Sequence, residues 1–381
     1  MLIYSHFFKE TNNAKIIVCM KRILHLPGMC HGGVGSVIMN LYRGIDKTRY
    51  ALDVCVIEET SYREEIESYG GKVFVIPKRK EVGTINYIKN IKKIIDENGY
   101  DIIHVHSVFT GIFSLIAAYF SHASVRIYHA HNTVDNIVSK GKFSFIIVPL
   151  FRFLIGWMAT KKIACGRGAG HYVFGKSKFE VIPNGVDLSR FKPLLTEERE
   201  RIRKELGYGK KDIVVGNVAS FIEVKNQSFF IELAKSDKQG RCIFILVGDG
   251  PMLDEIRKKA SENHVEDKIQ FLGNRTDVHL LFNAMDIFCL PSLFEGLPVT
   301  AIEAQACGTP VVTTSKVTDE ADMGIVPYER IASFNPEEWI GCFYKTEKTA
   351  NRNVDVVRNK MREMHYDIED SVNKILSYYS K

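Results

Sequence analysis

Two glutamates eight residues apart give the strongest sign of chemistry in this sequence. Glu295 and Glu303 lie on either side of Pro298, a residue favoured in the first turn of a helix. Glu295 and Gly296 are therefore predicted in a loop and Glu303 inside the helix, where a carboxylate can accept hydrogen bonds from sugar hydroxyls. The amides at Gly296 and Leu297, with the helix dipole, favour an anion. The alternative is two solvated surface glutamates, but Glu303 stands in an otherwise apolar stretch.

A glycine-rich loop, LPGMCHGGVGS at 26–36, joins an apolar run to a helix-period pattern. Glycines such as Gly33 let backbone amides approach a ligand, and the amino terminus of a helix favours negative charge. The spacing fits neither the P-loop nor the G-x-G-x-x-G pattern. A phosphate-binding loop and a tight strand-to-helix turn are both consistent with it.

Four histidines stand at the ends of two predicted strands, His104 and His106 in one and His129 and His131 in the next. Alternation along a strand places each pair on one face of a sheet. A neutral imidazole such as that of His131 can orient a hydroxyl or act as a general base. A metal site is the alternative, although no carboxylate stands at the usual spacing. For His104 a structural role is the simpler interpretation.

Lys225 follows another predicted strand, at the start of the next helix. At that place a lysine can meet a diphosphate as a point charge. Surface lysines often have no specific role, so this residue gains meaning only beside the other motifs.

The elements that must hold these residues alternate between short β-branched runs and helix-period segments. This alternation is typical of an α/β fold, with parallel sheets covered by helices on both faces. Turn signals in 182–193 place a linker between two such series, so we expect two facing, doubly wound domains. Because ligands bind at the carboxyl ends of parallel strands, a cleft between the domains is predicted. The predicted strands are 23–26, 52–57, 73–76, 102–105 and 126–129, then 213–218, 242–247, 269–272, 287–290 and 310–313.

The composition fits a globular protein of two domains. Of its 381 residues, 45% are hydrophobic and 25% charged, and the net charge of +6 is too diffuse to indicate nucleic-acid binding. Eight cysteines are scattered without a C-x-x-C pair, which indicates a reducing cytoplasm and neither zinc nor disulfides. The first 19 residues lack the apolar core of a signal peptide, and the first recognisable element begins at Met20.

The segment 143–160 is apolar, with lysines on both sides of it. It contains Pro149 and Arg152 and is at the short end for crossing a bilayer, so a helix packed within the first domain is the preferred interpretation. Shallow insertion at the inner face of a plasma membrane, with the lysines near anionic headgroups, is the alternative.

Taken together, these motifs resemble the retaining glycosyltransferases of family four, which have the GT-B fold, and most closely those of bacterial capsules and exopolysaccharides. The marks include GGVG at 32–35, MNLYRGID at 39–46, HAHNT at 129–133, VIPNGVD at 181–187, GDGP at 248–251 and FLG at 271–273, beside the glutamate pair. The resemblance implies an acceptor-binding domain at 20–185 and a sugar-nucleotide domain at 190–360. A final helix at 361–381 is expected to pack back on the first domain.

The resemblance also implies a role for each matching residue. Glu303 would hold the donor ribose, and Glu295 with the backbone at 296–297 would contact the donor sugar and diphosphate. Lys225 would pair with the leaving diphosphate. Gly33 and Gly248 would lie in donor-binding loops, and His131 near the transferred sugar and acceptor. No metal and no cofactor are expected, because cations and helix termini would stabilise the diphosphate.

The sequence departs from the family pattern at two positions. Ser220 replaces an arginine usual five residues before Lys225, which removes a bidentate phosphate partner, and Gly35 replaces a frequent glutamate. Arg275 is a candidate substitute for the missing arginine.

The expected activity is transfer of a hexose from a nucleoside-diphosphate sugar, with UDP as the favoured nucleotide. The expected acceptor is a saccharide, free or linked to polyprenyl diphosphate, in cell-surface polysaccharide synthesis at the cytoplasmic side of the membrane. Two alternatives stay open, a UDP-sugar 2-epimerase of related fold and a non-catalytic sugar-nucleotide-binding subunit.

Overall fold

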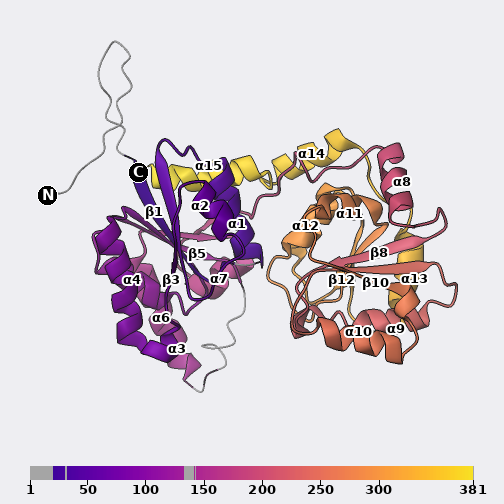
Figure 1. The fold of residues 1–381 in the computed structure, drawn as a ribbon, viewed down its shortest axis with the longest axis horizontal. Helices are drawn as coiled ribbons and strands as arrows, with labels where there is room; N and C mark the ends of the chain where they lie inside the picture. Colours follow the sequence, from indigo (N-terminus) through magenta and orange to yellow (C-terminus); the bar gives the residue numbers. More distant parts are fainter. Residues whose placement is uncertain (1–19, 31, 133–140, 142, 381) are drawn as a thin grey trace, which may run out of the picture.

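The computed structural model describes residues 20–30, 32–132, 141 and 143–380, which form two parallel β-sheets flanked by helices (Figure 1). The first 19 residues, Thr133 of the HAHNT motif, and Lys140 and Lys142 beside the apolar segment lie outside the described residues. The two sheets stand side by side, each in its own layered unit. The predicted α/β class, with two doubly wound units, is therefore confirmed.

The first sheet has seven strands in the order β3-β2-β1-β4-β5-β6-β7, and its pairings are all parallel. Its strands are β1 (Lys21–Gly28), β2 (Tyr50–Val56), β3 (Val73–Val75), β4 (Ile102–His106), β5 (Val125–Ala130), β6 (Lys161–Ala164) and β7 (Glu180–Val181). The helices that join them are α1 (Gly32–Gly44), α2 (Arg63–Ser68), α3 (Arg79–Val82), α4 (Thr84–Asn98), α5 (Ile112–Tyr119), α6 (Ser144–Met158) and α7 (Arg167–Phe174).

Both faces of the first sheet are buried, which explains its continuous apolar strands. Ile102 belongs to the core on the α1 side, whereas its neighbour Ile103 belongs to the core under α4 and α5. Successive side chains of a strand point to opposite faces, so each strand contributes to both cores.

The second sheet has six strands in the order β10-β9-β8-β11-β12-β13, again in parallel. Its strands are β8 (Ile213–Val218), β9 (Cys242–Val247), β10 (Ile269–Gly273), β11 (Ile287–Leu290), β12 (Val311–Thr314) and β13 (Tyr328–Ile331). Its helices are α8 (Thr196–Glu205), α9 (Phe229–Ser236), α10 (Leu253–Glu262), α11 (Val278–Ala284), α12 (Val299–Ala306) and α13 (Pro336–Thr346), with 3-10 turns η1 (Glu223–Lys225), η2 (Glu266–Lys268) and η3 (Asp319–Ala321).

All ten predicted strands overlap observed ones, whereas β6, β7 and β13 were not predicted. β6 opens with two lysines, β7 has two residues, and β13 carries an exposed Glu329 and Arg330. These strands lie at or beside a sheet edge, where the continuous apolar pattern of a central strand is not required.

Two segments cross between the sheets and pair with each other. Val186, in the linker after β7, exchanges backbone hydrogen bonds with the segment before α15 (Ile368–Tyr379), at 2.8 Å to the Tyr366 carbonyl and 3.1 Å from the Ile368 amide. α14 (Val354–Glu363) packs on α12 of the second unit, whereas α15 packs on α1 of the first (Figure 1). A side chain at Gly185 would lie 2.5 Å from the Ile368 Cα, so the two crossings touch closely.

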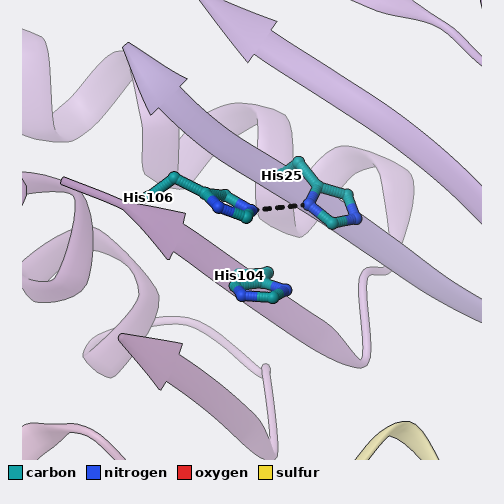
Figure 2. A group of neighbouring side chains, drawn as sticks. All are labelled: His25, His104 and His106. Carbon is teal, nitrogen blue, oxygen red and sulfur yellow. Dashed lines mark hydrogen bonds between the residues drawn. The ribbon is translucent and has the colours of Figure 1, made fainter. Parts of the chain in front are cut away.

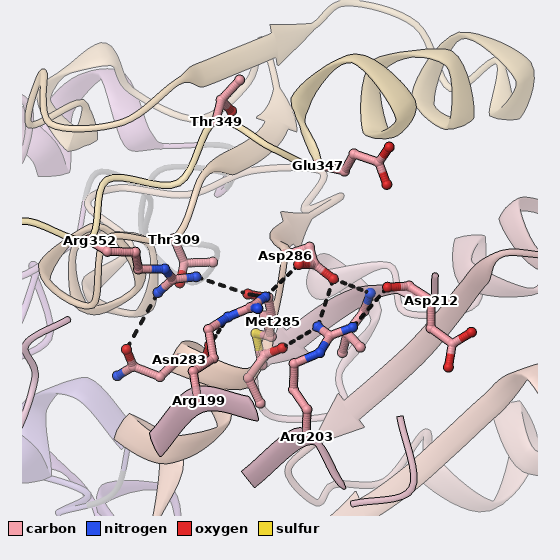
Figure 3. Close-up of polar contacts among 12 residues, drawn as sticks. Arg199, Arg203, Asp212, Asn283, Met285, Asp286, Thr309, Glu347, Thr349 and Arg352 are labelled. Atoms are coloured by element: carbon pink, nitrogen blue, oxygen red, sulfur yellow. Dashed lines mark hydrogen bonds and ion pairs between the residues drawn. The ribbon is translucent and has the colours of Figure 1, made fainter. Parts of the chain in front are cut away.

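Three arginines, Arg199, Arg203 and Arg352, hold α8 and the loop before α14 against the carboxyl ends of α11 and α12 (Figure 3). Arg199 and Arg203 both pair with Asp286, at 2.5 and 2.8 Å. Arg203 and Arg352 also donate to the carbonyls of Ala284 and Cys307, at 2.8 and 2.9 Å. Carbonyls at the carboxyl end of a helix carry partial negative charge. These carbonyls and Asp286 therefore stabilise the arginines, whose role is structural.

Candidate active site

A cavity of about 830 Å³ opens between the two units. It is bordered by α1 and α15 on one side, by the 184–191 linker, and by the ends of β8, β10 and α12 on the other. The lining residues most able to bind a ligand are Ser36, Asn40, Arg43, Asn184, Asp187, Arg190, Arg275, Thr276 and Glu303. The predicted cleft is therefore present, and two of the predicted donor-binding side chains reach it.

Glu303 reaches this cavity from the second turn of α12, which starts after Pro298 as the sequence predicted. Its helix neighbours Ile302 and Ala304 are fully buried, so the carboxyl lies at the boundary of core and cavity. Burial raises its pKa to about 8, an effect that the guanidinium of Arg190 partly opposes. A carboxyl in this state is poised to ionise when hydroxyl donors arrive.

Two of the three arginines that border the cavity, Arg275 and Arg190, lie on the side of the second unit and have different partners. Arg275 forms a bidentate pair with Asp277, at 2.8 and 2.6 Å, which raises the pKa of the arginine and lowers that of the aspartate. Its charge is therefore already balanced. Arg190 donates to the Thr276 carbonyl at 2.9 Å and lies close enough to Glu303 to affect its pKa. Sequence reasoning singled out Arg275 and missed Arg190, which stands three residues after the VIPNGVD motif at 181–187.

Lys225 and Glu295 form an ion pair beside the start of α12. Lys225 ends the turn η1, and Glu295 also accepts from the Ser292 hydroxyl at 2.9 Å. Both side chains are largely buried, at 21% and 13% exposure. Two of the three residues predicted to be catalytic, Lys225 and Glu295, are thus brought together, outside the lining of the larger cavity.

The loops at the ends of β8 and β9 are packed so tightly that only glycine fits. A side chain at Gly248 would lie 2.1 Å from the Ala219 carbonyl oxygen, and Gly248 has a φ of +136°. Ser220 is exposed on the facing loop. Gly248 therefore shapes the loop that carries Ser220, and it lies outside the lining of the cavity.

The other predicted loop residues have distinct surroundings. Gly33 borders the cavity, with open space where a side chain would stand. Leu297, which follows Gly296, packs against the cores of both units. The loop at 296–297 is therefore a contact between the units in addition to its predicted place near the donor.

Glu320 makes a second contact between the units, which the sequence did not reveal. Its carboxylate accepts from the backbone amides of Arg167 and Gly168, at 2.8 and 3.0 Å, at the first turn of α7. A negative side chain is stabilised at a helix amino terminus, so this contact holds η3 of the second unit to the first.

His131 belongs to a buried cluster of five histidines with His25, His104, His106 and His129. Its Nε2 lies 2.9 Å from the Nδ1 of His106, and burial lowers its pKa to about 3, so the ring is neutral at physiological pH. His106 in turn contacts His25, which sequence reasoning missed (Figure 2). The predicted pairs, His104 with His106 and His129 with His131, thus lie in one cluster, because β4 and β5 are neighbours in the sheet.

The apolar segment 143–160 contains α6, which packs on the core of the first domain, as preferred, through Ile155 and Met158 and leaves its other side at the surface. One side packs on α5, where Phe113 and Phe151 are in edge contact. On the other, Phe145, Phe153 and Trp157 are 61–73% exposed. No helix in the described part of the chain is both long and apolar enough to cross a membrane.

Comparisons with known proteins agree with this geometry. Residues 31–190 match the family model "Glycosyltransferase Family 4", and residues 198–323 match "Glycosyl transferases group 1". The chain is 33% identical to the putative glycosyltransferase EpsF of Bacillus subtilis, over 94% of this chain and 96% of that protein. It is 28% identical to the UDP-Gal:alpha-D-GlcNAc-diphosphoundecaprenol alpha-1,3-galactosyltransferase of Escherichia coli, over 66% and 70%. The crystal structure of Anabaena HepE in complex with UDP has a TM-score of 0.74 and 19% identity, covering 95% of this chain and all of that one, and so shares its GT-B fold.

Proposed function

The chain belongs to glycosyltransferase family 4, and we propose that it transfers a hexose, with retention of configuration, from a UDP-sugar to a lipid-linked saccharide in cell-surface polysaccharide synthesis. The Escherichia coli relative supports the donor and acceptor classes, because its name gives UDP-galactose and a diphosphoundecaprenol-linked sugar. The geometry of α12 carries the proposal. One short helix holds Glu303 at the cavity, and the loop before it holds Glu295 against Lys225.

The reaction depends on stabilising the leaving group. When the anomeric C–O bond breaks, negative charge develops on the diphosphate, and cations with amide donors already in place lower the barrier. Lys225 and the amino end of α12 supply such groups, so the transfer itself needs no metal. Glu295 holds Lys225 in position until the donor arrives. Attack on the same face as the leaving group, with the proton passing to a diphosphate oxygen, would retain the configuration.

Acceptor-dependent release of UDP tests the proposal. The wild type should release UDP from a UDP-sugar when given a lipid-linked saccharide extract, and Lys225→Ala should release almost none. Lys235→Ala is the matched control, since Lys235 is exposed on α9 and, within the described part of the chain, forms an ion pair with Glu232 of the same helix alone. Nucleotide binding without release, with any acceptor, would favour the binding-subunit alternative that Ser220 suggests. Conversion of the donor sugar without acceptor would favour the epimerase.

A lipid-linked acceptor also requires contact with a membrane surface, which we assign to the exposed side of α6. Ile146, Leu150, Phe153 and Trp157 recur at helical spacing along it. The single charged residue of the helix, Arg152, donates to the Tyr172 carbonyl at 2.7 Å. Two short basic runs, 78–80 and 92–93, contribute less than their sequence suggests, because Lys78, Lys92 and Lys93 form ion pairs with neighbouring carboxylates. Shallow apolar insertion is therefore the main contribution expected.

A further inference from the structure

A column of histidines continues an apolar column on one face of the first sheet. Ile23, Ile102 and Ile127 pack under α1 and α15. The next side chains on that face, toward the carboxyl edge of the sheet, are His25, His104, His106 and His129, with His25 opposite His104 and His106 opposite His129. His131 follows directly after β5. Along this face of β1, β4 and β5, the side chains thus change from isoleucine to histidine as the strands approach the cleft.

The hydrogen bonds within this cluster leave several nitrogens unused. His106 lies between His25 and His131, at 2.9 Å from each, and His104 lies 3.2 Å from His129. Among the described residues, His25 Nε2, His129 Nε2 and His131 Nδ1 are buried without a partner. A buried polar atom without a partner is unfavourable, so a ligand that occupies these nitrogens would be stabilised by them.

We propose that His106, His129 and His131 bind one divalent transition-metal ion of the zinc class. One nitrogen from each of the three lies within 4.8 Å of the others, and the three residues are 2%, 1% and 8% exposed. Ligands at about 2.0–2.1 Å from a tetrahedral zinc ion are roughly 3.4 Å apart, so small shifts of the rings suffice. Imidazole without carboxylate suits zinc, cobalt or nickel and disfavours magnesium and calcium.

A second, small cavity borders this site at His129. It is about 20 Å³ in volume and is bordered by His129 and by Asn184, whose Oδ1 is also buried without a partner among the described residues. Asn184 borders the larger cavity as well, so the two adjoin. The volume holds one water, which could be the fourth ligand.

The ion would be separate from Lys225 and Glu295, which support the transfer chemistry beside the start of α12. Its role would be to tie β4 to the end of β5, beside the nucleotide cavity. In the neighbouring trio of His25, His104 and His106, one nitrogen from each ring also lies within 4.8 Å of the others (Figure 2). Neither His25 nor His104 borders the small cavity, and so we assign the ion to the trio that contains His129.

Metal titration of untagged, EDTA-dialysed protein tests the inference. We expect one Zn²⁺ per chain by calorimetry, visible d–d absorption of a four-coordinate ion with Co²⁺, a higher melting temperature with Zn²⁺, and no binding of Mg²⁺. His131→Asn should weaken Zn²⁺ binding more than about 100-fold, because losing an outer-shell partner alone costs about 10–100-fold. His122→Asn is the control, since His122 is exposed.

His25→Asn distinguishes the two trios, because it removes only a hydrogen-bond partner of His106 and should weaken Zn²⁺ binding by no more than about 10–100-fold, less than His131→Asn does. Absence of stoichiometric Zn²⁺ binding by the wild type would overturn the proposal. So would loss of binding in His25→Asn with retention in His131→Asn, or Mg²⁺ binding as tight as Zn²⁺. Circular dichroism checks that each variant folds, and His129→Asn replaces His131→Asn if the latter does not.

Discussion

Glu303 should make nucleotide affinity depend on pH in a way that reveals how it binds. Its pKa in the free protein is raised to about 8 by burial. Ribose hydroxyls donate to a carboxylate, so binding should favour the ionised form and release a proton. Affinity should therefore rise with pH until about 8 and level off above it, and Glu303→Gln should remove this dependence.

The size of the change in nucleotide affinity follows from the raised pKa of Glu303. At pH 7, one unit below the pKa, ionising Glu303 costs about 1.4 kcal/mol, so affinity at pH 9 should exceed that at pH 7 about 10-fold. The stability of the fold should depend on pH in the opposite direction. Because the folded pKa is raised, the stability that the neutral carboxyl contributes is present at acid pH and is lost as pH rises through about 8. Bound nucleotide should offset that loss.

Calorimetry with the nucleoside that binds best is the suitable assay, because a nucleoside carries no phosphate that titrates near pH 6. Buffers of different ionisation enthalpy at pH 7 should show release of about 0.9 proton per site. Glu303→Gln should bind more weakly than the wild type at pH 9. The affinity of this variant should be the same at pH 7 as at pH 9. An affinity of the wild type that is flat or falls between pH 7 and 9 would refute the assignment of ribose to the Glu303 carboxylate.

Three further predictions concern catalysis, membrane contact and folding. Ser220→Arg should raise turnover, since a bidentate phosphate contact contributes about 1.5–3 kcal/mol, and unchanged acceptor-dependent UDP release would contradict this. Phe153→Ser with Trp157→Ser should weaken liposome flotation by at least about 10-fold, as each buried aromatic contributes about 1.5–3 kcal/mol, and equal flotation would reject α6 as the contact. Gly308→Ala should lower the free energy of unfolding in urea by at least about 2 kcal/mol more than Gly70→Ala does. Both glycines have positive φ, but only at Gly308 would a side chain clash, 1.8 Å from the Asn351 carbonyl oxygen. Equal losses of stability in the two variants would count against that clash.

Sequence patterns predicted the elements whose residues follow a local pattern, such as the apolar run of a buried strand. Ile102 and Ile103 face opposite cores because a central parallel strand is buried on both sides, and such strands are visible as apolar runs. The helix start near Pro298 was predicted for a similarly local reason, and it places Glu303 correctly. The strand β13 was not predicted, since its exposed Glu329 and Arg330 break the apolar pattern.

The parts of the site that depend on contacts distant in sequence were not predictable. Glu320 lies 153 residues from Arg167, and only the arrangement of the two units brings them together. His25 looked like an ordinary strand residue until the register of β1 with β4 placed it opposite His104. Arg190 stands in a turn motif that indicated only a linker, yet the crossing segments bring it to the cavity beside Glu303.

The anomeric configuration of the first product tests the central claim most directly. The wild type would be incubated with an α-linked UDP-sugar and a lipid-linked saccharide, and the new linkage examined by NMR through its anomeric coupling. Retaining transfer predicts an α-linked product, formed in equal amount with UDP and lost in Lys225→Ala. A β-linked product, or UDP release without any new glycosidic bond, would contradict the account.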